Sequence, residues 1–148
     1  MVKKRHSNIP ASYMMLLKEN KTLLLRRFNT GYEDGNYSLP AGHVDLGENF
    51  TQCVVREIEE EIGVLVEPED AKVVHTMHRD SGTQGNNERV DVFFVAKKWQ
   101  GEIVNKEPTK CDDLEWFDID NLPENVIPYI RQAIDGMKDK KYYSECGW

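Results

Sequence analysis

The sequence predicts an α/β domain with a mixed β-sheet and helices on both of its faces. Runs rich in β-branched and apolar residues recur along the chain, and two helical segments interrupt them, one after Asn49 and one at Pro128–Lys138. A sheet with helices on both faces buries the apolar sides of all these elements. The chain has 148 residues, of which 39% are hydrophobic, so we expect one core and a single domain over residues 1–148.

Charge and composition argue against several classes of protein. A formal net charge of −7 disfavours broad binding to nucleic acids or anionic membranes, and no apolar run reaches the ~18 residues of a membrane span. The basic start Met1–His6 leads into no signal-like segment, and the three cysteines are odd in number and widely spaced. We therefore expect a cytoplasmic protein with reduced thiols, without membrane contact or a stable nucleic-acid partner. The oligomeric state is left open.

The elements before the first helix are predicted to be strands. Ala11–Lys18 and Thr22–Arg27 are rich in apolar residues, and the short polar turn between them predicts a hairpin. The second strand ends in two arginines, which lie on opposite faces, so only one of them can point toward a site. The turn-rich stretch Phe28–Gly35 then leads to a short extended segment that ends at Ala41.

Strands are also predicted between the two helices. Ala71–Arg79 and Arg89–Ala96 form a second antiparallel pair, and the polar residues 81–87 provide the loop between them. Leu114–Asp118 predicts a short strand before the final helix. The polar tail from Asp139 onward predicts no element.

The most informative stretch runs from Gly42 to Val64 (GHVDLGENFTQCVVREIEEEIGV). Asn49 is a suitable N-cap, and Gly63 stands where a helix would end in a left-handed residue. At ~100° per residue, one face of this helix carries the three glutamates Glu57, Glu60 and Glu61. A neighbouring flank that can pack inward carries Thr51, Val55, Ile58 and Ile62.

Three carboxylates on one helix face repel one another, and like charges four residues apart weaken a helix. A hard divalent cation with oxygen ligands would remove this conflict. Mg²⁺ takes a few carboxylates and completes its shell with waters and substrate phosphates, and Mn²⁺ suits the same ligands. The alternative is an acidic helix face in solvent, which is the usual place of glutamate runs. The spacing alone does not decide between the two.

The frame around the glutamates resembles the signature of the Nudix hydrolases. Gly42, Glu48 after five further residues, and the run REIEEEIGV after seven more match the family pattern GX5EX7REUXEEXGU, in which U is aliphatic. The match spans residues 42–64, and a weaker resemblance to MutT-type members extends to both sides. It implies an α/β/α sandwich with a mixed sheet, in which the glutamates of the box helix face a substrate cleft.

The resemblance also implies roles for the residues of the box. Members of the family hydrolyse a nucleoside diphosphate linked to another moiety and use Mg²⁺ or Mn²⁺. The implied metal ligands are the carbonyl of Gly42 and the carboxylates of Glu57, Glu60 and Glu61. Glu57 would also be the leading general base, oriented by Arg56, with Glu48 in support. A loop carboxylate that completes the metal site is matched best by Glu107, with Glu102 second, and either could instead be an ordinary solvated acid.

Three residues outside the helix match substrate contacts of MutT-type enzymes less closely. Arg27 is the second member of an Arg-Arg pair, His43 replaces a common lysine, and Asn125 lies near the place of a base-reading asparagine. Each has a plain alternative as a surface residue, and the spacing from Asn125 to Pro128 departs from the MutT pattern.

The box implies cleavage at a diphosphate and does not identify the rest of the substrate, for which the resemblance of the short chain to MutT-type members outside the box is the guide. The leading expectation is a MutT-like pyrophosphohydrolase that converts a nucleoside triphosphate, in ordinary or oxidised form, into a monophosphate and pyrophosphate. An ADP-ribose or dinucleoside polyphosphate pyrophosphatase is the alternative. A catalytically silent nucleotide-binding regulator would have lost box residues, and none is missing here.

Overall fold

The computed structural model describes residues 1–82 and 87–148, so most of the predicted loop at residues 81–87 lies outside the described residues. The helices are α1 (Phe50–Ile62), the short 3₁₀ helix η1 (Pro68–Asp70) and α2 (Pro128–Lys138). The strands are β1 (Ile9–Lys18), β2 (Lys21–Arg27), β3 (Tyr37–Ser38), β4 (Ala41–His43), β5 (Lys72–Asp80), β6 (Glu88–Ala96), β7 (Cys111–Asp118) and β8 (Tyr143–Cys146). Each predicted strand and helix is present within a few residues of its expected bounds.

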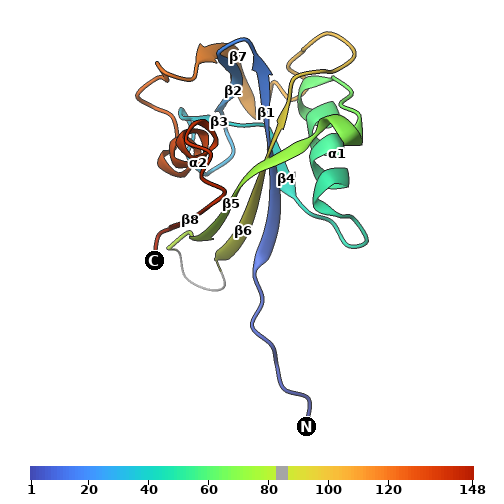
Figure 1. Ribbon diagram of the computed structural model, residues 1–148, viewed down its shortest axis with the longest axis vertical. Coiled ribbons are helices and arrows are strands. Elements are labelled where there is room, and N and C mark those ends of the chain that lie inside the picture. The colour runs from blue at the N-terminus through green and yellow to red at the C-terminus, as the bar shows by residue number, and fades with distance from the viewer. Residues whose placement is uncertain (83–86) are drawn as a thin grey trace.

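The strands form a mixed sheet in the order β3-β2-β1-β6-β5-β8, with β4 added to β1 and β7 added to β2 (Figure 1). β1 runs parallel to β6 over most of its length, whereas β5 pairs antiparallel with β6 as predicted. The predicted hairpin is short, because β1 and β2 pair only at Leu17↔Thr22 and Lys18↔Lys21 before β2 turns away to β7. The strands that pair with β2 (β3 and β7) therefore diverge from those that pair with β1 (β4 and β6).

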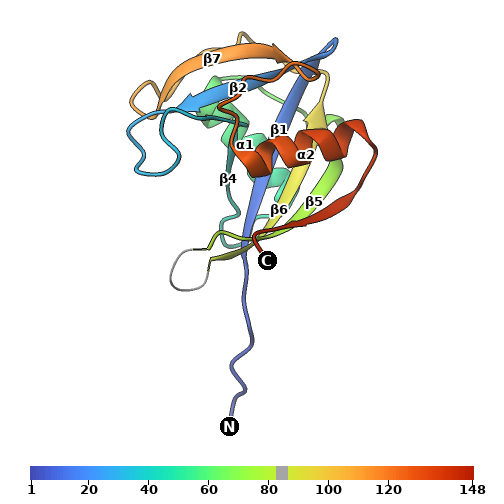
Figure 2. The same cartoon turned by 90° about the vertical axis from the view of Figure 1, so that its left-hand side faces the viewer.

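The two helices cover opposite faces of the sheet, as Figures 1 and 2 show. The alternating side chains of β1 enter both cores: Met14 packs in the α1 core and Met15 in the α2 core. Ile58 of α1 and Ile130 of α2 are fully buried in these respective cores. The predicted α/β/α sandwich with a mixed sheet is therefore confirmed. No helix among the described residues is long and apolar enough to cross a membrane.

Local signals fix both ends of α1. The side chain of Asn49 accepts a hydrogen bond from the backbone N–H of Gln52, and the Gln52 side chain accepts one from the backbone N–H of Asn49. Gly63 ends the helix with φ 75°, a left-handed conformation that glycine adopts at no steric cost. Both predicted boundaries are confirmed.

The inward face of α1 differs from the predicted one. The buried residues are Cys53, Val54, Ile58 and Ile62. Of the predicted flank, Ile58 and Ile62 are buried and the half-buried Val55 packs against the same core, whereas Thr51 is half-buried and is not part of it. The helix is rotated so that the line from Val54 through Ile58 to Ile62 meets the sheet. This rotation keeps Glu57 and Glu61 beside β4 instead of in open solvent.

Loss of the N-cap should weaken the fold measurably. We expect Asn49→Ala to lower the free energy of unfolding by about 1 kcal/mol, because one backbone donor of the first turn loses its acceptor. Urea unfolding of the variant and the wild type would measure the difference. Glu59→Ala, at an exposed position of the same helix, is the matched control and should change stability much less. Equal effects of the two substitutions would contradict a specific role of the cap.

The C-terminal tail contains an element that the sequence did not reveal. β8 pairs in parallel with β5 at the edge of the sheet, within the polar tail whose sequence is uninformative about structure. Polar contacts specify this strand: the hydroxyl of Ser144 lies 2.7 Å from Nε2 of His75 and accepts from the Gln132 amide at 2.9 Å. A hydrophobic pattern cannot signal a strand whose one buried residue is a serine.

Candidate active site

Gly42 brings the backbone of β4 against the acidic face of α1. A Cβ atom at this position would lie 2.1 Å from Oε1 of Glu57, so no other residue fits without moving that carboxylate. The thiol of Cys53 lies behind the same turn, 3.5 Å from the Gly42 carbonyl oxygen and 3.4 Å from that of His43. Burial raises the pKa of this thiol to about 11, which makes it a packing group, not a nucleophile.

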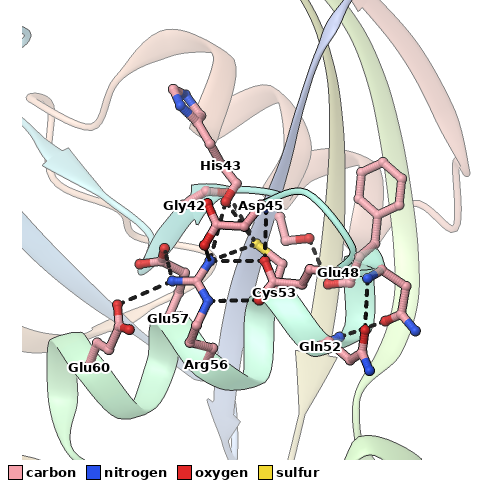
Figure 3. Close-up of polar contacts among 12 residues, drawn as sticks. Gly42, His43, Asp45, Glu48, Gln52, Cys53, Arg56, Glu57 and Glu60 are labelled. Carbon is pink, nitrogen blue, oxygen red and sulfur yellow. Dashed lines mark hydrogen bonds and ion pairs between the residues drawn. The ribbon is translucent and has the colours of Figure 1, made fainter.

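Arg56 is the centre of the polar network in Figure 3. Its guanidinium binds Glu48 with two hydrogen bonds, from Nε at 2.7 Å and from Nη2 at 3.0 Å. Nη1 donates to Oε1 of Glu57 at 2.7 Å and to Glu60 at 3.2 Å. Asp45, which the sequence analysis did not single out, adds an ion pair at 3.3 Å. The guanidinium thus fixes the direction of Glu57 from one side.

The carboxylates on the other side of Glu57 crowd together. Burial raises the pKa of Glu61 well above its usual range, and the negative charges of Glu57 and Glu107 raise it further. Burial also raises the pKa of Glu57, against the opposing effect of Arg56. The backbone N–H of Ala41 donates to Glu61 at 3.3 Å. Three carboxylates from α1 and a distant loop therefore meet with an excess of negative charge.

Glu48 is the opposite case, because its pKa is lowered to about 2, mainly by its hydrogen bonds with Arg56. A lowered pKa stabilises the fold at pH values above the ordinary value of 4.5, and this contribution is lost as pH falls from 4.5 toward 2. We expect Glu48→Gln to cost about 1.5–3 kcal/mol of stability at pH 7, the range for hydrogen bonds to charged groups.

The pH dependence of that loss provides the check. Urea unfolding at pH 7, 5, 4 and 3 should show wild type and Glu48→Gln converging as pH falls below 4.5, because Glu48 of the unfolded chain then binds a proton while the folded protein keeps its carboxylate ionised. The exposed Glu69→Gln is the control, with little difference from wild type at any of these pH values. A constant gap between wild type and Glu48→Gln down to pH 3 would contradict the ion pair as its cause.

A cavity of about 600 Å³ opens beside this network. Its lining includes Gly42 and the four carboxylates Glu57, Glu60, Glu61 and Glu107. Two predicted substrate contacts, Arg27 and His43, also line it. Arg26 instead pairs with Asp112 at 2.7 Å, outside the cavity lining, which agrees with the predicted alternation of the two arginines.

Two weaker candidates lie elsewhere. Asn125 is not among the residues that line the cavity, and its side-chain amide donates to the carbonyl of Gly35 at 2.8 Å. Asn125 therefore links two loops through its side chain, which agrees with the departure of its spacing from the MutT pattern. Glu102 also lies outside the cavity lining, which favours Glu107 as the loop carboxylate.

Several cavity residues escaped the sequence analysis: Tyr13, Tyr32, Arg79, Arg89, Lys110 and Tyr129. They come from β1, β5, β6, α2 and two loops. Each lies in or next to a segment whose type was predicted, but pairing across the sheet decides which of their side chains meet. The contact of Arg79 with the ring of Tyr129 would have marked these residues, but it is recognised only in the folded structure.

The donor set fits a hard divalent cation in its chemistry. All the candidate ligands are oxygen atoms, and among the described residues Glu61 and Glu107 form no ion pair, whereas Glu57 and Glu60 pair with Arg56. Among residues 1–82 and 87–148, no three His, Cys, Asp or Glu side chains already stand together as a finished metal site. Arg56 holds Glu57 and Glu60 at its own Nη1, so small side-chain rotations would be needed to close the set.

The chain matches known proteins over most of its length. The family model described as NUDIX domain matches residues 8–137. An NAD-capped RNA hydrolase NudC from Stutzerimonas stutzeri (strain A1501) is 34% identical over 129 residues, 87% of this chain and 42% of that protein. This chain thus spans less than half the length of that relative. An ADP-ribose pyrophosphatase from Methanocaldococcus jannaschii is 31% identical over 123 residues, 83% of this chain and 69% of that protein.

Solved structures agree with these relatives. A MutT NUDIX hydrolase from Burkholderia pseudomallei superposes with a TM-score of 0.80 and 27% identity, covering 88% of this chain and 98% of that one. A MutT protein from Methanosarcina mazei Go1, at 18% identity and a TM-score of 0.76, supports the fold alone. With the complete box, the cavity and the family match over residues 8–137, the chain belongs to the NUDIX domain family.

Proposed function

We propose that this Nudix hydrolase converts a nucleoside triphosphate into a nucleoside monophosphate and pyrophosphate, with Mg²⁺ or Mn²⁺ as cofactor. The observation that carries the proposal is a single cavity lined by both carboxylates and basic side chains. Four carboxylates lie in its wall together with Arg27 and Lys110. A triphosphate brings more negative charge than a diphosphate that bridges two sugars, so two additional cations near the acidic group favour the triphosphate.

The residues that would hold the cation are the carbonyl of Gly42 and the carboxylates of Glu57, Glu60, Glu61 and Glu107. A bound divalent ion supplies positive charge that offsets the phosphates and makes a nearby water more acidic. Arg56 keeps its 2.7 Å hydrogen bond to Glu57 and so limits how far that side chain can turn. Glu48 in turn holds Arg56 through its two hydrogen bonds.

Glu57 is the leading candidate for the general base. Burial raises its pKa, which makes the carboxylate a better proton acceptor than an exposed one. It would take the proton of the water that attacks the α- or β-phosphorus. The bond from that phosphorus to the oxygen bridging α and β would break, which releases nucleoside monophosphate and pyrophosphate. Glu107 is the alternative base, because it lines the same cavity from a loop.

Arg27 is proposed to bind phosphate from the other wall. Its Nε donates to the carbonyl of Tyr32 at 2.6 Å and its Nη2 to the hydroxyl of Thr30 at 3.1 Å. These bonds tie the guanidinium to the loop between β2 and β3 at the cavity wall. A guanidinium held in this way loses little freedom when an anion binds.

ADP-ribose is the second candidate substrate. The relative from Methanocaldococcus jannaschii bears the name ADP-ribose pyrophosphatase, and this chain covers 69% of it. The Stutzerimonas relative is named as a hydrolase of NAD-capped RNA. The expectation that this chain has no stable nucleic-acid partner therefore stays a prediction to be tested.

A substrate panel separates these possibilities. Wild-type protein with Mg²⁺ would be incubated with the common nucleoside triphosphates, 8-oxo-dGTP, ADP-ribose, diadenosine polyphosphates, NAD and NAD-capped RNA, and the products identified by chromatography. The proposal expects pyrophosphate and a monophosphate from a triphosphate, and no product after chelation of the metal. Preferential cleavage of ADP-ribose would move the assignment to the second candidate. Nucleotide binding without cleavage under either metal would replace the enzyme by a binding protein.

A further inference from the structure

Two arginines lie side by side on adjacent strands in the wall of the cavity. Arg79 of β5 and Arg89 of β6 are directly paired in the strand register, and both line the cavity. Like charges directly opposite each other destabilise a sheet. Asp91, which is completely buried, relieves this for one of them: Nε of Arg79 donates to its Oδ2 at 2.7 Å.

The guanidinium of Arg79 is held in place by contacts with three neighbouring side chains, those of Asp91, Tyr13 and Tyr129. The residue is buried, and its side chain is only 6% exposed. Its guanidinium lies over the ring of Tyr129, 3.8 Å from the ring centre, and Nη2 donates to the hydroxyl of Tyr13 at 3.4 Å. Nη1 has no hydrogen-bond partner among residues 1–82 and 87–148, and Arg79 belongs to the cavity lining. The structure therefore presents a preorganised donor to whatever fills the cavity.

Polar atoms of two residues next to Arg79 are buried without a hydrogen-bond partner in the described part of the chain. Within the described part of the chain, Nη1 of Arg89 is buried without a hydrogen-bond partner. Oδ1 of Asp91 is in the same condition, and Asp91 is fully buried. A buried polar group without a partner costs free energy, which a ligand or water with the complementary group recovers.

We propose that Arg79 is a specificity residue that donates to a carbonyl on the nucleobase of the substrate, so that the enzyme prefers bases with a keto group to bases with an amino group at that edge. The inference rests on the proposed function, because it assumes that a nucleotide occupies the cavity. Asp91 and Tyr13 position the guanidinium, and Tyr129 supports its plane.

A base fits this wall better than a phosphate does. The charge of Arg79 is already balanced by Asp91, so the pair offers a directed N–H group more than a net positive charge. The neighbouring wall is aromatic and apolar, with Tyr13, Tyr129 and Leu25. Phosphates have other partners in the same cavity, since Arg27 and Lys110 line it and neither forms an ion pair with a carboxylate among the described residues. An amino group on the base would place its N–H donors against the N–H donors of Arg79, so no hydrogen bond could form.

Inosine and adenosine nucleotides form the matched pair for the test, because they differ at one edge by a keto group in place of an amino group. In wild type, kcat/KM for ITP should exceed that for ATP by about 5- to 150-fold, the discrimination of a good arginine contact. UTP against CTP is a second keto and amino pair. If the enzyme cleaves ADP-ribose instead, the same comparison uses its inosine analogue.

Three variants separate recognition from folding. Arg79→Lys keeps a charge for Asp91 but loses the planar fork, and the ITP to ATP ratio should fall to within about threefold of one. Arg79→Met combined with Asp91→Leu removes both charges together, which avoids a buried unpaired carboxylate and should give the same loss of preference. Arg26→Lys, in an arginine–aspartate pair that does not line the cavity, is the matched control and should leave the ratio unchanged.

The outcomes distinguish this inference from the proposed function. A wild-type preference for ATP, a ratio near one, or a ratio that Arg79→Lys leaves intact would overturn the role of Arg79 while the hydrolase stands. If no substrate in the panel is cleaved, the proposed function fails, and calorimetric binding of IMP and AMP then decides the inference by itself. Tighter binding of IMP to wild type, lost in Arg79→Lys, would support it, and equal binding of the two would overturn it.

Discussion

Replacement of Glu57 by glutamine is expected to lower kcat by about 10²- to 10⁴-fold, the range for loss of a general base, while the fold remains intact. Glutamine has nearly the same shape, and its amide oxygen can still accept the hydrogen bond from Nη1 of Arg56. It can neither take a proton from water nor neutralise a cation. Steady-state kinetics with the substrate identified in the panel, together with the melting temperature, would measure both effects.

Controls on the same helix make this result specific. Glu59→Gln removes a charge at an exposed position and should leave kcat within about threefold of wild type, because screening by solvent weakens distant charges. Glu107→Gln tests the alternative base. A larger loss of kcat in Glu107→Gln than in Glu57→Gln would assign the proton transfer to the loop residue and leave Glu57 a ligand role. Unchanged kcat in both variants would contradict the proposed site altogether.

The parts of the site that the sequence predicted are local. Glu57, Glu60 and Glu61 share a face because the period of one helix places them there, and Asn49 and Gly63 mark the ends of that helix through their own conformations. Such features depend on residues within a few turns of one another, so spacing and capping rules suffice.

The parts that escaped depend on contacts across the sheet. Arg79 meets Asp91, Tyr13 and Tyr129 because β5, β6, β1 and α2 converge, and the register that brings them together is not encoded in any short stretch. The same limit explains the missed strand β8, which depends on Ser144 meeting His75. Sequence patterns thus located the acidic half of the cavity and left the half with Arg79 and Arg89 to the structure.

Substitution of Gly42 by alanine should be nearly as damaging to catalysis as loss of the Glu57 charge, although Gly42 contributes no side chain. The added Cβ would lie 2.1 Å from both Oε1 and Cδ of Glu57 and 2.5 Å from its Cγ. The carboxylate is the flexible partner in this clash, so it must move, and a displacement of about 1 Å in an active site can cost about 10²-fold in rate. We expect kcat/KM to fall by about that factor, measured by steady-state kinetics.

A double-mutant cycle tests whether the damage acts through Glu57. If Gly42→Ala harms the enzyme by displacing that carboxylate, the same substitution in a Glu57→Gln background should cost less than about threefold, because the displaced charge is already absent. The backbone of Gly42 lies outside the left-handed region, so alanine is allowed there and the melting temperature should change little. Full additivity of the two losses would show instead that Gly42 acts through its own carbonyl or through the path of β4, independently of the base.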